Sequence, residues 1–256
     1  FEKALIAREI RLVYQPVVTI DGAQIVGAEA LVRWTHRDLG PISPATILDL
    51  AELTGLIGQL NHWIFSQAAN DAATWPKSAH GDRFIAVNVT PSELNLPELA
   101  SHVRDALVSS GIEAKNLVIE LSERIVAPTK GFTENLDRLS ELGVRLALDD
   151  FGEGRTSLAH LRGLPIDILK TDQLLAQHST RSAPDRIILE SVCRLAHELG
   201  MTVVAEGVED RNQLEAVAAA RADFVHGYLF YKPMDHGELL ALLFQAAPSF
   251  AEAKVS

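Results

Sequence analysis

The stretch ALDDFGEGRTS, residues 147–157, places two adjacent aspartates at the end of an apolar run and a Phe-Gly-Glu-Gly turn directly after them. Successive side chains of a regular strand point to opposite faces, so such a strand cannot aim Asp149 and Asp150 at one point. We expect the strand to end at Asp149, because its last residue and the next one are released from this alternation. Two like charges placed together at a strand end indicate a site whose chemistry needs both.

Short apolar runs recur along the chain and alternate with segments of helical periodicity. The predicted strands are Leu12–Thr19, Gln24–Trp34, Arg83–Val89, Leu117–Leu121, Val144–Asp149, Asp167–Thr171, Thr202–Glu206 and Phe224–Phe230. About eight strands alternating with helices over 256 residues predict an α/β fold, a (β/α)8 TIM-like barrel, with an open doubly wound sheet as the alternative. Only Asp21-Gly22 and its flanks join the first two strands, which predicts a hairpin and hence an antiparallel first strand.

Two helices have recognisable ends. One is predicted to begin at Ser43-Pro44, a capping residue followed by proline in the first turn, and to end near Gly55. Another is predicted from Asp185 to Leu199, with Gly200 after its end. The apolar face of this second helix is expected at Ile188, Val192, Leu195 and Leu199.

The composition limits the class of protein. With 47% hydrophobic residues, the 256-residue chain can bury a full core. Its net charge of −11 argues against binding along duplex nucleic acid, which relies on excess Lys and Arg. Cys193 is the only cysteine, which excludes an intrachain disulfide and argues against a thiolate zinc site; we expect it to be a small buried helix residue.

The sequence shows no apolar run of membrane-spanning length and no signal peptide. It begins with Phe1 rather than Met. We expect residues 1–256 to form a single domain of a longer multidomain protein. The expected location is the cytoplasm, with any membrane anchor in a region outside this sequence.

Polar side chains stand at the carboxyl ends of the predicted strands, where barrel enzymes collect their chemistry. They are Glu29, Asn88, Glu120, Asp149, Asp150, Lys170, Asp172 and Glu206. Converging carboxylates raise one another's pKa unless a cation compensates them. Their oxygen atoms are hard ligands that suit Mg²⁺ or Mn²⁺, and no histidine pair has the HxH or HExxH spacing of a zinc enzyme. Asp149 would then bridge two ions about 4 Å apart, as in two-metal phosphodiester chemistry.

These residues resemble a known family. GAEALVRW, residues 27–34, is similar to the signature of the EAL domains, phosphodiesterases of the bacterial second messenger cyclic di-GMP. The other matches keep the family's order along nearly the whole chain: YQPVV (14–18), NVTPSEL (88–94), IELSE (119–123), DDFGEGRTSL (149–158), LKTD (169–172), AEGVED (205–210) and HGYLFYKPM (226–234). The resemblance implies a (β/α)8-like barrel whose first strand is antiparallel, in agreement with the predicted hairpin.

The resemblance also implies roles for the strand-end residues. The expected ligands of one metal ion are Glu29, Asn88, Glu120 and Asp149, and those of the second ion and its water are Asp149, Asp150 and Glu206. The expected catalytic residues are Lys170, Glu206, Asp150 and Glu29. Lys170 is expected to contact the attacking water and stabilise negative charge, with a buried salt bridge to a neighbouring carboxylate as the alternative.

Further residues are expected around the metal ions. Those implied to contact substrate are Gln15, Arg33, Asp172 and His226, with a plain salt bridge as the alternative for Arg33. Those implied to support the site or shape its loop are Glu123, Glu209, Phe151, Gly152 and Gly154. For Glu123 and Glu209 the alternative is ordinary loop capping.

The implied reaction is the hydrolysis of one phosphodiester of cyclic di-GMP to linear pGpG, with two Mg²⁺ or Mn²⁺ ions activating the water. A catalytically weak or inactive domain that only binds cyclic di-GMP is the alternative. The family further implies a homodimer through the helices that flank the Phe151 loop and a regulatory domain upstream.

One position departs from the family pattern in a way that bears on chemistry. His226 stands where the family has the Gln of a QGY motif. A neutral imidazole both donates and accepts a hydrogen bond, as a carboxamide does, whereas a protonated one only donates. We therefore expect hydrolysis to be weaker, or more sensitive to pH, than with Gln.

Overall fold

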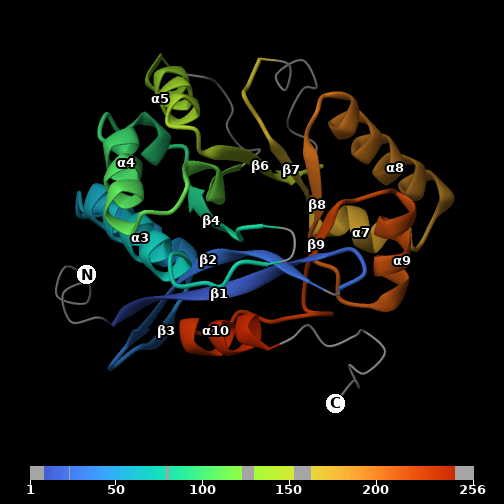
Figure 1. Ribbon diagram of the computed structural model, residues 1–256, viewed down its shortest axis with the longest axis horizontal. Coiled ribbons are helices and arrows are strands. Elements are labelled where there is room, and N and C mark those ends of the chain that lie inside the picture. The colour runs from blue at the N-terminus through green and yellow to red at the C-terminus, as the bar shows by residue number, and fades with distance from the viewer. Residues whose placement is uncertain (1–8, 23, 79–80, 123–129, 153–162, 246–256) are drawn as a thin grey trace.

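The computed structural model describes residues 9–22, 24–78, 81–122, 130–152 and 163–245. Within these ranges eight strands close into a barrel in the order β1-β9-β8-β7-β6-β5-β4-β2, with β2 paired back to β1 (Figure 1). Their bounds are β1 Ile10–Thr19, β2 Ile25–His36, β4 Phe84–Val89, β5 Leu117–Ser122, β6 Arg145–Phe151, β7 Ile168–Thr171, β8 Thr202–Ala205 and β9 Phe224–His226. The short strand β3 (Gly40–Ile42) extends the sheet beyond β2.

The first strand runs against both of its neighbours. β1 is antiparallel to β2 and to β9, whereas the pairs that join β2, β4, β5, β6, β7, β8 and β9 are parallel. The β1–β2 hairpin turns at Asp21-Gly22, where Gly22 takes a φ of 68°. The predicted barrel with an antiparallel first strand is confirmed, and its closure rules out the open doubly wound sheet.

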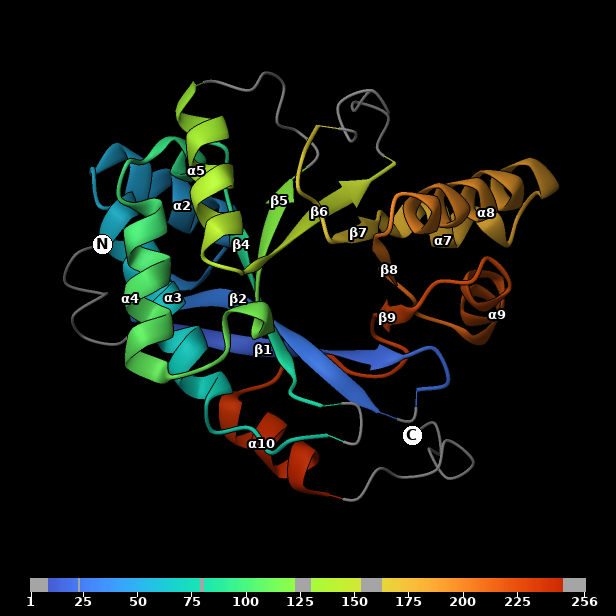
Figure 2. The same ribbon diagram turned by 45° about the horizontal axis from the view of Figure 1, so that its top comes forward.

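Helices surround the barrel (Figure 2). They are α2 (Pro44–Leu53), α3 (Ile57–Ala72), α4 (Leu99–Ser110), α5 (Lys130–Glu141), α7 (Gln173–Ser179), α8 (Ala183–Glu198), α9 (Arg211–Ala219) and α10 (His236–Phe244), with 3₁₀ turns η1 (Glu93–Asn95) and η2 (Ala114–Asn116). α2 begins as predicted, since Ser43 Oγ accepts a hydrogen bond from Thr46 N at 3.2 Å and Pro44 opens the first turn. Within the described residues, no helix combines the length and the apolar character needed to span a membrane.

The helix predicted at residues 185–199 is α8, but its predicted apolar face is only partly right, since Val192 packs against the core whereas other members of the face do not. Ile188 and Leu199 are 49% and 41% exposed. The buried side chains are instead Leu189, Cys193 and Ala196. The stripe that packs on the barrel is therefore rotated by about one residue from the predicted stripe, and Cys193 is buried as expected.

The interior of the barrel contains an apolar layer of side chains. At the carboxyl ends of the parallel strands, which form a rim, the inward side chains are polar. The apolar layer consists of Val17, Phe84, Ala86, Val118, Ala147, Ile168 and Val204. Phe84 packs over Gly27, where a Cβ would stand only 2.6 Å from the phenyl ring. Because side chains alternate along a strand, the next inward positions are two residues further on. These positions are Asn88, Glu120, Asp149 and Lys170 on their strands and Glu206 directly after β8.

Most strand boundaries lie within two residues of the prediction, and two of the differences bear on the site. The strand predicted to end at Phe230 stops at His226, and the N–H groups of Phe230 and Tyr231 both bond to the carbonyl of Gly227 in a turn. The strand predicted to end at Asp149 continues to Phe151. The second difference decides how the two aspartates are arranged.

Candidate active site

The two adjacent aspartates lie in a β-bulge rather than at a strand end. At this point the β6–β7 pairing advances three residues along β6 against two along β7, so β6 carries an extra residue. Asp150 takes a φ of 58°, in the left-handed region that side-chain-bearing residues rarely adopt. The bulge brings oxygens of Asp149 and Asp150 within 4.8 Å of each other and of Glu206. The expected strand end at Asp149 is thus wrong, and the bulge removes the alternation instead.

One ammonium group stands at the centre of the rim. Lys170 Nζ lies 2.7 Å from Glu120 Oε1, 2.8 Å from Glu206 Oε1, and 3.3 Å from both Glu29 Oε2 and Asp149 Oδ1. Its side chain is 3% exposed. Four carboxylates therefore share one buried positive charge, which leaves an excess of negative charge when all are ionised. This is the geometry of the salt-bridge alternative for Lys170, and its contact with an attacking water stays a prediction.

The excess negative charge perturbs the carboxyl pKa values. Burial, reinforced by neighbouring carboxylates, raises the pKa of Glu120 well above its usual range in spite of Lys170. Burial likewise raises the pKa of Asp149 to about 7. For Glu206, burial also opposes ionisation, but Lys170 and a hydrogen bond from His226 lower its pKa to about 2. The rim therefore combines one firmly ionised carboxylate with two that resist ionisation.

These residues fit a divalent cation. Asp149, Asp150 and Glu206 form a cluster of hard oxygen ligands, the donors that Mg²⁺ and Mn²⁺ prefer. Glu120 Oε2 is buried and has no hydrogen-bond partner among the described residues. Both the unpartnered oxygen and the raised pKa values indicate charge that a cation would neutralise.

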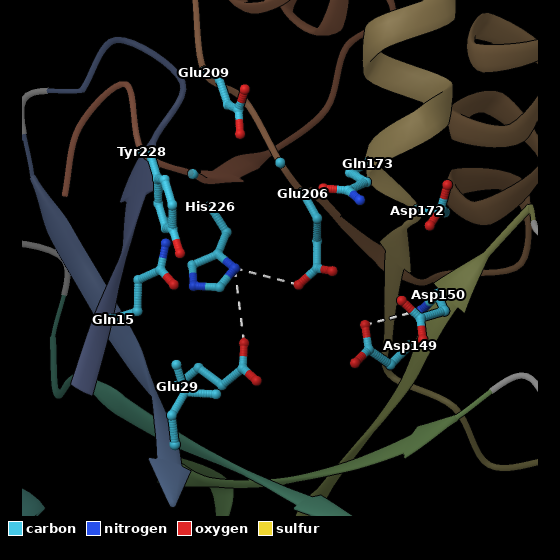
Figure 3. A pocket seen from close by; sticks show the side chains of 13 residues that line it. Gln15, Glu29, Asp149, Asp150, Asp172, Gln173, Glu206, Glu209, His226 and Tyr228 are labelled. Carbon is cyan, nitrogen blue, oxygen red and sulfur yellow. Dashed lines mark hydrogen bonds and ion pairs between the residues drawn. The ribbon is translucent and has the colours of Figure 1, made fainter. Parts of the chain in front are cut away.

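An open cavity of about 490 Å³ lies over the rim (Figure 3). Of the predicted site residues it is lined by Gln15, Glu29, Asp149, Asp150, Asp172, Glu206, Glu209 and His226. Gln15 is buried, and its Nε2 donates to the carbonyl of Tyr231 at 3.2 Å. Asp172 caps α7 by accepting a hydrogen bond from Leu174 N at 2.8 Å. The structure thus brings three of the expected substrate contacts, Gln15, Asp172 and His226, to the cavity wall.

Arg33 borders a different, mainly apolar cavity of about 410 Å³. This second cavity also touches Asn88, and Leu31 lines both cavities. Arg33 Nη1 donates to the carbonyl of Val32 at 2.9 Å. Asn88 Nδ2 donates to Glu29 Oε1 at 2.6 Å, which ties Asn88 to the predicted metal ligands. The structure therefore joins Asn88 to the rim and places Arg33 in the neighbouring cavity.

Three of the five residues expected to support the site or shape its loop lie within the described ranges. The backbone N–H of Glu209 donates to Gln213 Oε1 at 2.7 Å, which fixes the start of the segment that precedes α9. Phe151 is buried at the end of β6, and Gly152 takes a φ of 117° that a side chain would strain. Two of the predicted residues lie outside the described ranges: Glu123 and Gly154.

Besides Leu31 of the quoted GAEALVRW motif, four cavity residues were not among the predicted site residues: Gln173, Gly207, Gly227 and Tyr228. A Cβ on Gly207 would stand 2.2 Å from Gln173 Cβ, and one on Gly227 would stand 2.2 Å from the carbonyl oxygen of Val208. Each glycine therefore permits a close approach between the segments that follow β7, β8 and β9. The signal was present, because each of these residues directly follows a predicted site residue or its neighbouring glycine.

Comparison with known proteins gives the same assignment as the motifs. The family model described as the EAL domain matches residues 1–233. The chain belongs to the EAL domain family. EAL domains are metal-dependent, in agreement with the acidic clusters of the rim.

Two relatives of this EAL domain come from Pseudomonas aeruginosa. One is named cyclic di-GMP phosphodiesterase NbdA and is 37% identical over 251 residues, 96% of this chain and 32% of that protein. The other is named bifunctional diguanylate cyclase/cyclic di-GMP phosphodiesterase MucR and is 34% identical over 240 residues, 93% of this chain and 35% of that protein. This domain thus spans about a third of the length of both relatives.

Two solved structures resemble the domain along most of its length. The structure of PaMucR phosphodiesterase in complex with c-di-GMP has a TM-score of 0.85 at 34% identity and covers 93% of this chain and 97% of that chain. An EAL domain protein from Listeria monocytogenes has a TM-score of 0.77 at 29% identity and covers 93% of both chains. The barrel described above is therefore the fold of the family.

Proposed function

We propose that this domain is a metal-dependent phosphodiesterase that hydrolyses cyclic di-GMP to linear pGpG. The observation that carries the proposal is the convergence of Asp149, Asp150 and Glu206 at the floor of an open cavity, with Lys170 in contact with two of them. The names of NbdA and MucR support the substrate, as does the PaMucR structure in complex with c-di-GMP.

We further propose two Mg²⁺ or Mn²⁺ ions as the cofactors. The residues that would hold them are Asp149, Asp150 and Glu206 for one ion, and Glu29, Asn88 and Glu120 with Asp149 for the other. Bound divalent cations would lower the pKa of a water and offset the charge of the phosphate. Their positive charge also explains how a domain with a net charge of −11 would accept a dianionic ligand.

The chain itself supplies a fixed charge and substrate contacts. Burial opposes the charge of Lys170, but the surrounding carboxylates raise its pKa well above its usual value, so its ammonium persists at neutral pH. Gln15, held by the carbonyl of Tyr231, presents its carboxamide at the cavity wall for hydrogen bonds to the nucleotide. In the reaction the hydroxyl of water bonds to phosphorus, the P–O3′ bond breaks, and the 3′ oxygen takes a proton.

A product assay tests the proposal. Cyclic di-GMP is incubated with the domain and Mg²⁺ or Mn²⁺, and cyclic and linear dinucleotides are separated by chromatography. We expect pGpG, and we expect it to vanish in chelator and in Glu29→Ala. Glu215→Ala, which changes an exposed carboxylate on α9, should retain full turnover.

The same experiment separates the enzyme from the receptor alternative. Binding of cyclic di-GMP without linear product, in the presence of either ion, would replace hydrolysis with a receptor function. If cyclic di-GMP is neither bound nor hydrolysed, both the enzyme and the receptor function are refuted.

The remaining partners are part of the proposal. We propose that the domain acts in the cytoplasm, within a longer protein whose further domain controls it, and that it forms a homodimer. NbdA and MucR are about three times as long as this chain, which supports a longer protein with a further domain. Light scattering of the isolated domain would test the homodimer, and a monomer at micromolar concentration would contradict it.

A further inference from the structure

The rim holds two clusters of ligand atoms that differ in chemistry and share Glu206. One consists of Asp149, Asp150 and Glu206 and offers only carboxylate oxygens. The other consists of Glu29, Glu206 and His226, whose ligand atoms also lie within 4.8 Å of one another. We propose that His226 is a metal ligand in this domain, and that its nitrogen makes the second cluster select a borderline transition-metal ion over Mg²⁺.

The position of the imidazole supports ligation. His226 Nδ1 lies 3.3 Å from Glu206 Oε1 and 3.7 Å from Glu29 Oε2. The ring is 7% exposed, and its Nε2 has no hydrogen-bond partner among the described residues. Figure 3 shows the imidazole between Gln15 on one side and the two glutamates on the other. Both ring nitrogens are therefore shielded from solvent inside the site.

The backbone around His226 fixes where the ring lies. His226 ends β9, and its carbonyl accepts a hydrogen bond from Val208 N at 3.3 Å. The next residue, Gly227, is pressed so closely against Val208 that no Cβ would fit. A ligand on such a rigid strand end is held in place before an ion arrives, which favours tight binding.

The same two oxygens already have a positive partner. Glu29 Oε2 and Glu206 Oε1, the atoms nearest His226 Nδ1, lie 3.3 Å and 2.8 Å from Lys170 Nζ. A neutral imidazole, in contrast, brings a third electron-pair donor to the two oxygens, and a divalent cation satisfies all three at once.

Ligand chemistry then predicts the metal preference. Mg²⁺ prefers oxygen donors in a nearly ideal octahedron, whereas imidazole suits borderline ions such as Co²⁺ and Zn²⁺. A Gln at this position, the residue that the family motif leads one to expect, would offer a carboxamide oxygen instead. The two clusters would thus hold chemically different ions, a hard one beside Asp150 and, in place of a second Mg²⁺ or Mn²⁺ ion, a borderline one beside His226. This inference rests on the metal site of the proposed function but not on turnover.

Metal affinity, measured without cyclic di-GMP, tests the inference. The metal-free domain is titrated with Co²⁺, followed by visible absorption, and with Mg²⁺, followed by calorimetry. Loss of a partner outside the ligand shell already lowers metal affinity by roughly 10–100-fold. We therefore expect His226→Gln to weaken Co²⁺ binding by at least about tenfold while Mg²⁺ affinity stays within about twofold.

His62→Gln is the matched control. His62 is exposed on α3 and its ring lies 5.0 Å from that of His102, so this pair is another place where Co²⁺ would meet imidazole. Unchanged Co²⁺ affinity in this variant, with the loss in His226→Gln, would support the inference. Equal Co²⁺-to-Mg²⁺ affinity ratios in the wild type and His226→Gln would overturn it.

A second measurement leaves every residue of the proposed metal site unchanged. Pulsed electron paramagnetic resonance of the Mn²⁺-loaded His62→Gln domain detects imidazole nitrogen bonded to the ion. A nitrogen signal supports ligation by His226, and its absence at saturating Mn²⁺ contradicts it. Ligation without hydrolysis would leave this inference standing while refuting the phosphodiesterase, so the two proposals fail separately.

Discussion

Replacing Lys170 with Met tests whether the rim carboxylates depend on the buried ammonium. The substitution keeps most of the side-chain volume but removes the positive charge that contacts four carboxylates at 2.7–3.3 Å. Breaking a buried ion pair by removing one partner costs about 3–5 kcal/mol, because the remaining charge has no compensation. We expect a loss of this size in the free energy of unfolding, measured by urea titration in chelator at pH 8.

Thermal unfolding gives the same prediction in another form. Each kcal/mol shifts the Tm of a domain approaching this size by roughly 2–4 °C, so Lys170→Met should lower it by about 6–20 °C. Lys130→Met is the matched control, since its side chain is 90% exposed and, within the part of the chain that the structure describes, its ammonium pairs with Glu134 at 3.5 Å. Such surface pairs contribute about 0.3–0.5 kcal/mol, and the control should shift the Tm by no more than a degree or two.

Added Mn²⁺ should restore part of the loss, because the freed carboxylates gain a different cation. We expect Mn²⁺ to raise the Tm of Lys170→Met by more than that of the wild type. A loss below about 1 kcal/mol in chelator would refute the reasoning, since it would mean that the carboxylates tolerate one another without Lys170. A Mn²⁺ effect of equal size in both proteins would show that the ammonium and the ion do not act on the same charges.

Three further predictions concern stability and reactivity. Burial raises the pKa of Asp149 to about 7, above the usual value of about 3.9. Protonated Asp149 therefore stabilises the fold, fully below about pH 4, and this contribution is lost as the pH rises through 7. Unfolding free energies in chelator should fall between pH 5 and pH 8, and Asp149→Asn should flatten that slope; an unchanged slope would contradict the assignment. Gly27→Ala should cost about 1–3 kcal/mol in urea unfolding because a Cβ would meet the Phe84 ring at 2.6 Å, and a neutral change would show that the ring has room to move. Cys193 is buried, and burial raises the pKa of its thiol to about 11. A thiol reagent at pH 8 should therefore label it only after denaturation. Rapid labelling of the native domain would contradict the burial of this face of α8.

The barrel and most of its rim follow from simple periodicities. Side chains alternate along strands and parallel strands end at one edge, so the apolar positions Ala147 and Val204 imply inward-facing Asp149 and Glu206 two residues later. The motif order then fixed which of these polar residues belong together. These inferences needed no knowledge of packing, because the strand period carries them.

The two-residue alternation along strands does not predict three other features of the structure. The left-handed conformation of Asp150 depends on the bulge, and no glycine in the sequence marks it. Arg33 lies on β2 four residues beyond Glu29 and borders the neighbouring cavity, so its expected contact with substrate stays a prediction. The buried face of α8 was misjudged because the helix carries apolar residues on adjacent stripes, and only its packing on the barrel selects Leu189 over Ile188. The bulge at Asp150 and the buried face of α8 were missed for the same reason, because tertiary contacts decide both.

The most direct test of the central claim is the conversion of cyclic di-GMP in ¹⁸O-labelled water, with the product analysed by mass spectrometry. Linear pGpG should form with Mg²⁺ or Mn²⁺, carry one solvent-derived ¹⁸O on its 5′ phosphate, and be absent in chelator. Product that forms equally in chelator, or that lacks the label, would contradict a cation-dependent attack of water at the rim of Asp149, Asp150 and Glu206.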